Sequence, residues 1–342
     1  MKKSSAIIIV IFIATIAVIL WQRFIRDDFS LPKGGEAKEE TITILDNGGE
    51  VNKEIMVTNG VKHSVPLDSI LGGGPAKDGI PSIDRPKFIS ISEASKQLQD
   101  TEPGLALEMD NVSRFYPFQI LVWHEIVNDT INGRRVLVTY CPLCLSGIVF
   151  APMVDGERVE FGTSGKLWNS NLVMYDRKTD SLWSQILGEA IVGEKTGTRL
   201  EVLPSDQIRF GDWRKLHPNG EVLSQDTGAA RFYGQDPYGD YYTSPGTFFP
   251  VDKKDNRLSE KEFVLGIVVD GKAKAYWPTA VKKIGVVEDS FQGKIIIAEY
   301  EKDIDAIRLY EKKADGTRER INPFGSFWFS WVAAHPDTEL LQ

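Results

Sequence analysis

The stretches LALEMDNVSRFYPFQILVWHEIVNDTINGRRVLVTY (residues 105–140) and LGIVVDGKAKAYWPTAVKKIGVVEDSFQGKIIIAEY (residues 265–300) are two versions of one pattern. One ungapped shift of 160 positions, the distance from Tyr116 to Tyr276, aligns identical residues along both. The matched pairs are Asp110/Asp270, Tyr116/Tyr276, Val127/Val287, Asp129/Asp289, Gly133/Gly293, Tyr140/Tyr300, Asp155/Asp315, Gly156/Gly316, Gly165/Gly325, Trp168/Trp328 and Ser170/Ser330. A single register predicts an internal duplication, with repeat one at 104–170 and repeat two at 264–330.

Each copy has the pattern of one supersecondary unit. A strand, a tight turn (Asp110-Asn111 or Asp270-Gly271) and a second strand come first, because such residue pairs favour the positive φ of hairpin turns. A short apolar helix, another turn and a buried strand follow. The sequence therefore predicts an α+β, β-rich fold with two pseudo-repeated lobes of mainly antiparallel strands and short helices.

The N-terminal segment, residues 1–25, has two lysines followed by an apolar run from Ala6 to Trp21. The run ends in large residues rather than a small-residue cleavage site, which favours an uncleaved transmembrane signal-anchor. Positive charge before the run places the rest of the chain outside the cytoplasm. We therefore expect a single-pass protein of the cell membrane with an extracytoplasmic C-terminal domain; a cleaved signal peptide, the alternative, predicts the same compartment.

The remaining chain divides by composition into a polar spacer (residues 26–64) and a larger domain (residues 65–342). Within that domain, the central segment between the repeats, 171–263, is rich in aromatic and turn residues. The formal net charge is −8 and there is no long basic run, which argues against nucleic-acid binding.

The two cysteines of the chain, Cys141 and Cys144, form a C-x-x-C pair at the end of the first copy. A disulfide between them would close a very small loop, so its effect on the entropy of the unfolded chain would be slight. In the second copy the same positions hold Glu301 and Ile304. Because the shared scaffold does without the sulfurs, the pair is predicted to serve chemistry in the first lobe.

Three kinds of chemistry suit this pair, with His124 as a candidate helper. The two thiols could form a reversible disulfide, or bind a soft metal such as copper or zinc with His124 as third ligand. Cys141 could also be a nucleophile with His124 as its base. A small structural disulfide is the remaining alternative. The substrate, the reaction and any redox partner stay open at this point.

A second candidate site lies in the segment GKLWNSNLVMYDRKTDSLWSQ (residues 165–185). Its polar and aromatic residues could line a cleft that binds a polymer or protein, which would make the protein a non-catalytic binding or scaffold module. A buried structural network is equally compatible with an Asp-Arg pair beside aromatics. The candidate residues are Asn169, Asn171, Asp176, Arg177, Trp183 and Gln185.

Longer motifs resemble one family, the domain of unknown function numbered 3179, from about Ile70 to about Thr338. The motifs are GGGPAKDGIP, VWHEIVND, VTYCPLC, FGTSGKLWNSNLVMYDRKTDSLWSQ, VLSQDTG and DPYGDYY. The resemblance implies an exported or membrane-anchored protein and no defined activity. The matching positions are His124, Glu125, Asn128, Asp129, Cys141, Pro142, Cys144, Asp176, Arg177, Trp183 and Gln185. Some family members carry Thr at the second cysteine, which weakens a strict dithiol mechanism; here Leu145-Ser146-Gly147 and AYWPT also depart from the family pattern.

Overall fold

The structure is a computed structural model that describes residues 31–32, 34–46 and 49–342. The predicted transmembrane segment, residues 1–25, and the first residues of the spacer lie outside this range. Within the described ranges, no helix is both long enough and apolar enough to cross a membrane.

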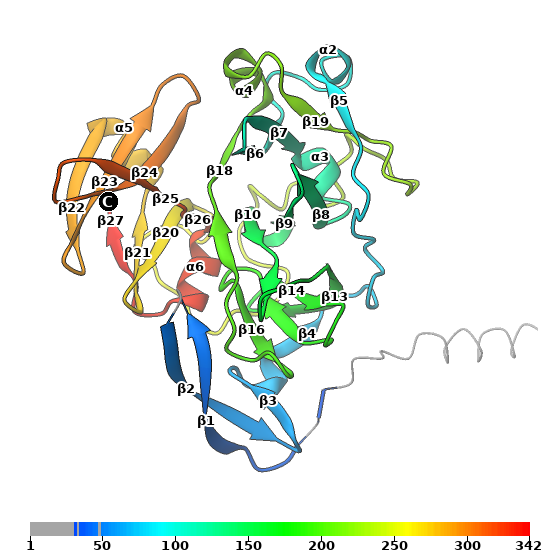
Figure 1. The fold of residues 1–342 in the computed structure, drawn as a ribbon, viewed down its shortest axis with the longest axis vertical. Coiled ribbons are helices and arrows are strands. Elements are labelled where there is room, and N and C mark those ends of the chain that lie inside the picture. The colour runs from blue at the N-terminus through cyan, green and yellow to red at the C-terminus, as the bar shows by residue number, and fades with distance from the viewer. Residues whose placement is uncertain (1–30, 33, 47–48) are drawn as a thin grey trace, which may run out of the picture.

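Short, mostly antiparallel sheets build the described part of the chain, which confirms the prediction of a β-rich fold (Figure 1). In the first lobe one sheet has the order β18–β6–β7–β19–β5 and another the order β17–β10–β9–β8. The bounds are β5 (Phe88–Ser90), β6 (Pro103–Met109), β7 (Val112–Pro117), β8 (Ile126–Ile131), β9 (Arg134–Cys141), β10 (Ser146–Ala151), β17 (Glu201–Leu203), β18 (Ser205–Arg209) and β19 (Glu221–Leu223). The helices are α2 (Ile91–Ala94), α3 (Phe118–Leu121) and α4 (Phe210–Leu216), and the 3-10 turn η2 covers Pro142–Cys144.

The second lobe repeats both sheets in the same order. One sheet is β26–β20–β21–β27 and the other is β22–β23–β24–β25. The bounds are β20 (Phe263–Val269), β21 (Lys272–Tyr276), α5 (Pro278–Ile284), β22 (Val286–Phe291), β23 (Lys294–Glu301), β24 (Ala306–Lys312), β25 (Arg318–Ile321), β26 (Phe324–Phe327), α6 (Trp328–Ala334) and β27 (Glu339–Leu341). The last strand of each lobe pairs in parallel, β19 with β7 and β27 with β21.

Strand pairing also locates the end of each unit. The segment β17–β18–α4–β19 occupies the place that β25–β26–α6–β27 occupies in the second lobe. A shift of 118 positions relates these two segments, and it matches Trp213 with Trp331 and His217 with His335. Gly165, Trp168 and Ser170, which the shift of 160 pairs with Gly325, Trp328 and Ser330, instead belong to another sheet. Whether the duplicated segments had the bounds 104–170 and 264–330 remains a prediction.

An inserted sheet separates the two parts of the first lobe. Its order is β1–β2–β3–β16–β15–β14–β13–β4, so the strands of the predicted spacer join strands from the middle of the chain. The bounds are β1 (Lys38–Asp46), β2 (Gly49–Thr58), β3 (Val61–His63), β4 (Ile70–Gly72), β13 (Phe161–Trp168), β14 (Asn171–Asp176), β15 (Leu182–Ser184) and β16 (Glu189–Val192). The short hairpin β11 (Met153–Val154) and β12 (Glu157–Arg158) precedes it, and the 3-10 turn η1 (Leu67–Ser69) lies before β4.

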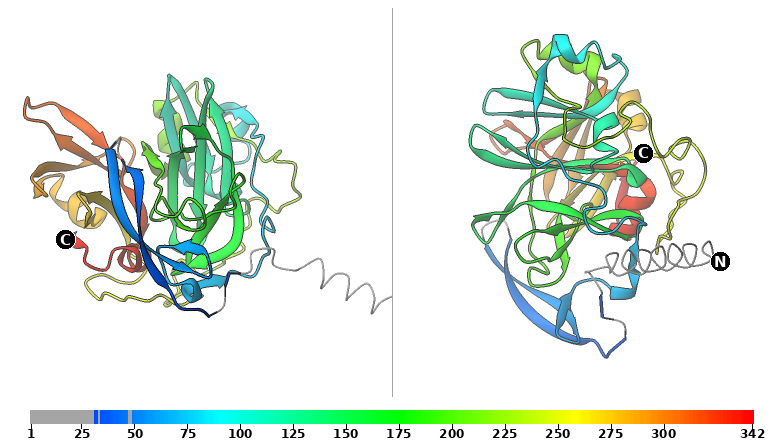
Figure 2. Two further views of the ribbon diagram at one scale, coloured as in Figure 1. Left: turned by 60° about the horizontal axis from the view of Figure 1, so that its bottom comes forward. Right: turned by 90° about the vertical axis from the view of Figure 1, so that its right-hand side faces the viewer.

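A long loop, residues 225–262, connects the lobes, and we call it the strap. It contains turns and bends rather than strands or helices, and Figure 2 shows it in yellow along the outside of the strands. Tyr241 of the strap is fully buried in the same apolar cluster as Cys141, Cys144 and Trp183. This cluster combines residues of the first lobe, the inserted sheet and the strap with residues of the second lobe such as Val264, Phe327 and Trp331.

Candidate functional site

The C-x-x-C pair lies in the turn that joins β9 to β10. Cys141 ends β9, η2 carries Pro142 to Cys144, and Leu145 closes the turn with a left-handed backbone at φ 50°. Ser146 then pairs with Cys141 across the ladder. The tight turn brings the two Sγ atoms to 3.1 Å, and both cysteines are free and almost fully buried.

Polar groups from the inserted sheet surround the sulfurs. The Cys144 thiol donates to the Ser170 carbonyl oxygen at 3.1 Å, and the Asn171 amide donates to the Cys144 Sγ at 3.3 Å. Gln185 accepts from the Ser146 hydroxyl at 2.7 Å and from the Asn171 amide at 3.0 Å. The pair is thus buried, and the Asn171 amide is a donor that can stabilise negative charge on sulfur, whereas the Ser170 carbonyl accepts from the protonated thiol.

The hairpin turn Asn169-Ser170, between β13 and β14, aims this carbonyl at the sulfurs. Both residues have positive φ, 51° and 60°, which is the backbone of a type I′ turn. The Asn171 Oδ1 accepts from the Ile186 amide at 3.0 Å, which fixes the orientation of the side-chain amide. Two segments of the inserted sheet therefore fix the groups that hydrogen-bond to the cysteine turn.

Glu125 is a buried carboxylate beside this turn, at a position where the second lobe has Gly285. Both residues follow a short helix and have positive φ, 58° and 95°. Their backbone bonds also correspond, since the amide of Tyr140 donates to Glu125 O at 2.7 Å and that of Tyr300 donates to Gly285 O at 2.8 Å. The first lobe thus places glutamate in a conformation that favours glycine, and such strain is common at functional sites.

A cavity of about 300 Å³ lies next to the cysteine turn. It is lined by Glu125, by Leu143 of the C-x-x-C turn, and by Tyr238, Phe248 and Phe249 of the strap, among others. The strap is fixed there by the Tyr241 hydroxyl, which donates to the Leu143 carbonyl at 2.9 Å. The carboxyl and the turn that bears the sulfurs therefore share one cavity, which the strap covers.

Burial controls the proton affinities at this site. It raises the pKa of Glu125 from 4.5 to about 8. It also raises the pKa of the Cys141 thiol well above its ordinary value, with further contributions from Cys144 and from the charge of Glu125. At neutral pH Glu125 therefore keeps its proton, beside a Cys141 thiol that is difficult to ionise.

His124, the predicted helper, does not join the sulfurs. Its Nδ1 donates to the Pro81 carbonyl at 2.6 Å, since a carbonyl can only accept, and its Nε2 then accepts from the Tyr233 hydroxyl at 2.7 Å. Burial lowers the pKa of the imidazole. Across the described ranges, no three His, Cys, Asp or Glu side chains lie close enough together to hold a metal ion.

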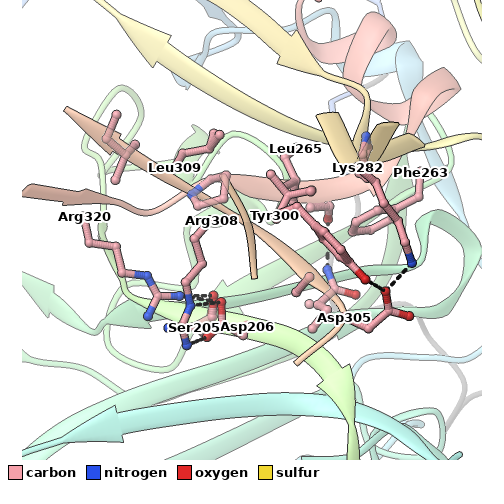
Figure 3. A pocket seen from close by; sticks show the side chains of 18 of the residues that line it. Ser205, Asp206, Phe263, Leu265, Lys282, Tyr300, Asp305, Arg308, Leu309 and Arg320 are labelled. Atoms are coloured by element: carbon pink, nitrogen blue, oxygen red, sulfur yellow. Dashed lines mark hydrogen bonds and ion pairs between the residues drawn. The ribbon is translucent and has the colours of Figure 1, made fainter. Parts of the chain in front are cut away.

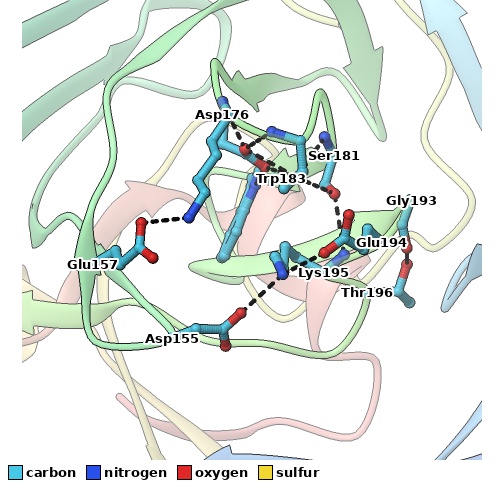
Figure 4. A network of polar contacts seen from close by, with 11 residues as sticks. Asp155, Glu157, Asp176, Ser181, Trp183, Gly193, Glu194, Lys195 and Thr196 are labelled. Carbon is cyan, nitrogen blue, oxygen red and sulfur yellow. Dashed lines mark hydrogen bonds and ion pairs between the residues drawn. The ribbon is translucent and has the colours of Figure 1, made fainter.

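The predicted cleft residues are mostly inside the protein. Asp176 accepts from the Trp183 indole at 2.9 Å and from the Thr179 amide at 2.6 Å, so it organises the turn between β14 and β15 (Figure 4). Asn169 accepts from the Asp252 amide of the strap at 2.8 Å.

Arg177 is the most exposed of these six residues. It donates to Asp84 at 2.8 Å and to Glu160 at 3.2 Å, and its other Nη donates to the Ser82 hydroxyl. Asn171 and Gln185 hold the cysteine turn, as described above. Five of the six residues are thus buried and hydrogen-bonded rather than arranged along an open cleft.

The fold and the site define a class: two related β-rich lobes, of which the first encloses a buried dithiol beside a protonated carboxyl. Within this class, residues 77–338 match the family described as protein of unknown function (DUF3179), and the chain belongs to that family. This agrees with the resemblance of its motifs. Neither a curated protein nor a solved structure matches the chain.

Sequence reasoning placed Glu125 among the family positions and gave it no role. The signal that identifies it was present, because the shift of 160 sets this glutamate opposite Gly285. Tyr238, Phe248 and Phe249 had no such signal, because no residue of the second lobe corresponds to the strap.

Proposed function

We propose that Cys141 and Cys144 form a reversible dithiol/disulfide redox site and that Glu125 exchanges protons with it. The observation that carries the proposal is the 3.1 Å contact between two free sulfurs inside a polar cage. A disulfide bond is about 2.0 Å long, so the turn needs only a small adjustment to form one.

The reaction that fits this geometry is exchange with a substrate disulfide. A thiolate of the pair attacks one substrate sulfur, which breaks the substrate S–S bond and releases the first substrate thiol. The second cysteine then attacks the sulfur of its partner, which forms the Cys141–Cys144 bond and releases the second substrate thiol. Two electrons and two protons pass to the substrate, and the Asn171 amide favours negative charge on Cys144.

Glu125 is suited to accept a thiol proton during this exchange. Its pKa of about 8 makes the Glu125 carboxylate a stronger base than an ordinary carboxylate of pKa 4.5. A negative charge on Glu125 raises the pKa of the Cys141 thiol, so proton uptake by Glu125 would favour the Cys141 thiolate. Glu125 is therefore proposed to set the rate of thiolate formation.

The substrate would reach the sulfurs from the cavity that the strap covers. Cys141 and Cys144 are almost fully buried, and Leu143 stands between them and the cavity. Displacement of Tyr238 and Tyr241 would open this side of the turn. We propose that the strap admits the substrate by moving as one loop.

The proposed location is the outer face of the cell membrane, with residues 1–25 as the anchor. The support for this is the apolar run and its preceding lysines, together with an oxidising compartment that suits a dithiol cycle. Protease treatment of intact cells, with detection of a C-terminal tag, tests the orientation. Digestion only after the membrane is disrupted would contradict it.

The redox proposal is tested on purified protein equilibrated with glutathione buffers of graded potential. Mass spectrometry after alkylation should show one two-electron transition that joins Cys141 to Cys144. Cys144→Ser should trap a mixed disulfide on Cys141. Glu125→Gln should slow exchange at least tenfold at pH 7 and leave both thiols able to react.

Native thiols that stay unreactive at every potential, and react only after unfolding, would contradict the proposal. A disulfide that no physiological thiol reduces would instead identify a structural bridge. Copper or zinc retained in stoichiometric amount, and lost in Cys141→Ser, would favour the soft-metal alternative.

A further inference from the structure

The second lobe has a cavity at the turn that corresponds to the C-x-x-C turn. The turn between β23 and β24, from Tyr300 to Ile307, occupies the place of Tyr140 to Gly147 in the first lobe. Tyr300, Asp305 and Ile307 line a cavity of about 300 Å³ there (Figure 3). Its other wall comes from β18 and from Gly147 of β10, so both lobes contribute.

One side of this cavity is an ion cluster across the lobes. Asp206 of β18 accepts from Arg308 of β24 at 2.6 Å and from Arg320 of β25 at 2.5 Å (Figure 3). The carboxylate side chain is 9% exposed and the two arginines 23% and 26%, so the cluster is largely removed from water. A guanidinium has five N–H groups, and one shared carboxylate leaves each arginine with donors for another acceptor.

A second ion cluster lies at the mouth of the cavity. Asp305 accepts from Lys282 of α5 and from the Tyr300 hydroxyl at 2.8 Å. Arg209 approaches its other oxygen at 3.8 Å. This cluster contains one acidic residue, Asp305, and two basic residues, Lys282 and Arg209.

The charges of the lining do not cancel. Three basic residues, Lys282, Arg308 and Arg320, face two acidic ones, Asp206 and Asp305. Among the lining residues one positive charge is therefore in excess, and in a partly desolvated site its attraction to an anion is stronger than in water. Two charges just outside the lining offset each other, Arg209 next to Asp305 and Glu301, which interacts with Arg308. The rest of the lining is largely apolar and includes Phe263, Leu265, Ile307, Leu309 and Ile321.

We propose that this inter-lobe cavity binds an organic monoanion with an apolar body. Its carboxylate would take the guanidinium N–H groups that Asp206 leaves unused, and its apolar part would lie against Phe263 and Leu265. Polyphosphates are a poor match, because a single excess positive charge cannot balance their several negative charges. The volume, about 300 Å³, is at the small end of ligand sites.

Binding is tested by calorimetric titration of the purified protein with benzoate and with benzamide, which share a ring and differ in charge. Benzoate should bind saturably and at least tenfold more tightly than benzamide. Arg320→Leu should weaken benzoate binding at least tenfold. The matched control is Arg318→Leu, because Arg318 lies on the same strand, points to Glu299 at 2.8 Å and does not line the cavity; it should bind as the unaltered protein does.

A second variant keeps the test decisive if Arg320→Leu unfolds. Thr279→Trp replaces an exposed lining residue and removes no ion pair, so it should block the mouth and abolish binding in a folded protein. Equal affinity for benzoate and benzamide would overturn the proposal. So would benzoate binding that persists in both Thr279→Trp and Arg320→Leu, or no binding to the unaltered protein.

Discussion

The two lobes share a backbone and differ in chemistry. Each has the same two sheet orders, the same parallel closing strand and a left-handed residue after its first helix. The matching turn bears Cys141 and Cys144 in the first lobe and Glu301 and Ile304 in the second. The comparison shows that the fold does not need the sulfurs, so the polar cage around them is an addition.

A shared ion network is the clearest sign of the common scaffold. Tyr116 donates to Asp129 at 2.6 Å, and Tyr276 donates to Asp289 at 2.8 Å. In each lobe a cation also bridges that aspartate and a carboxylate on the closing strand. These bridges are Arg114 with Asp129 and Glu221, and Lys274 with Asp289 and Glu339. The network is therefore common to both lobes, although the residues of the neighbouring turns differ.

The largest effect is expected where the lobes differ most, at Glu125. Because its pKa is about 8 in the folded protein and 4.5 when unfolded, rising pH between these values favours the unfolded state, which has already lost the proton. The unfolding free energy should therefore fall by about 3–4 kcal/mol between pH 5 and pH 8 on account of this group. Urea unfolding across this range should show the slope, and Glu125→Gln should remove it.

Glu125→Gly makes the first lobe match the second at this position. It should remove the same pH dependence and also relieve about 1 kcal/mol of left-handed backbone strain. Thiol exchange should slow as in Glu125→Gln. A glycine variant less stable than the native protein at pH 8 would show that the carboxyl is a structural group.

The next prediction compares the two ion networks, whose aspartates differ in burial. The Asp129 side chain is 3% exposed and that of Asp289 is 17% exposed. Asp129→Asn should therefore cost about 3 kcal/mol, because it leaves the partly buried Arg114 with Glu221 as its remaining ion-pair partner and places a neutral amide in the buried position. Asp289→Asn should cost about 1–2 kcal/mol. Equal losses of unfolding free energy in chemical denaturation would mean that the different burial of Asp129 and Asp289 does not affect stability.

The smallest effect is expected at Gly266 of the second lobe, which packs against the Trp331 ring. A Cβ on Gly266 would lie 2.3 Å from the Trp331 ring, whereas the matching residue of the first lobe is Ala106. Gly266→Ala should cost about 1 kcal/mol through overpacking, the low end of the range for such changes. Ala106→Gly should cost about 0.5–1 kcal/mol through backbone entropy. Thermal unfolding of both variants checks the order, and a neutral Gly266→Ala would mean that the ring moves freely.

The sequence predicted the elements that local pattern determines. The shift of 160 gave the strands, turns and short helices of both lobes up to β10 and β24, because turn residues and strand alternation are local signals. Beyond β10 the inserted sheet changes the offset between the two lobes from 160 to 118 positions. Gly165 and Trp168 therefore matched Gly325 and Trp328 in the sequence but lie at different positions in the fold. Pairing across a long insertion depends on non-local contacts that a single register cannot show.

The site was predictable only in part, for the same reason. The cysteine pair is visible in the sequence, but Ser170, Asn171 and Gln185 reach it from an inserted sheet. His124 was a candidate because the second copy has Ile284 at the matching position, yet its ring binds Tyr233, 109 residues away on the strap. The difference between the copies therefore identified the sulfurs but not the residues that surround them.

The left-handed backbone at Glu125 has a consequence for how this site persists over generations. Glutamate and glycine codons can differ by a single base, so mutation continually offers a variant that should fold more stably. Selection for stability alone would favour that replacement, and stabilising substitutions are readily available because natural proteins are rarely at their stability optimum. Retention of glutamate at position 125 would then indicate how strongly cells depend on the proton that this side chain carries.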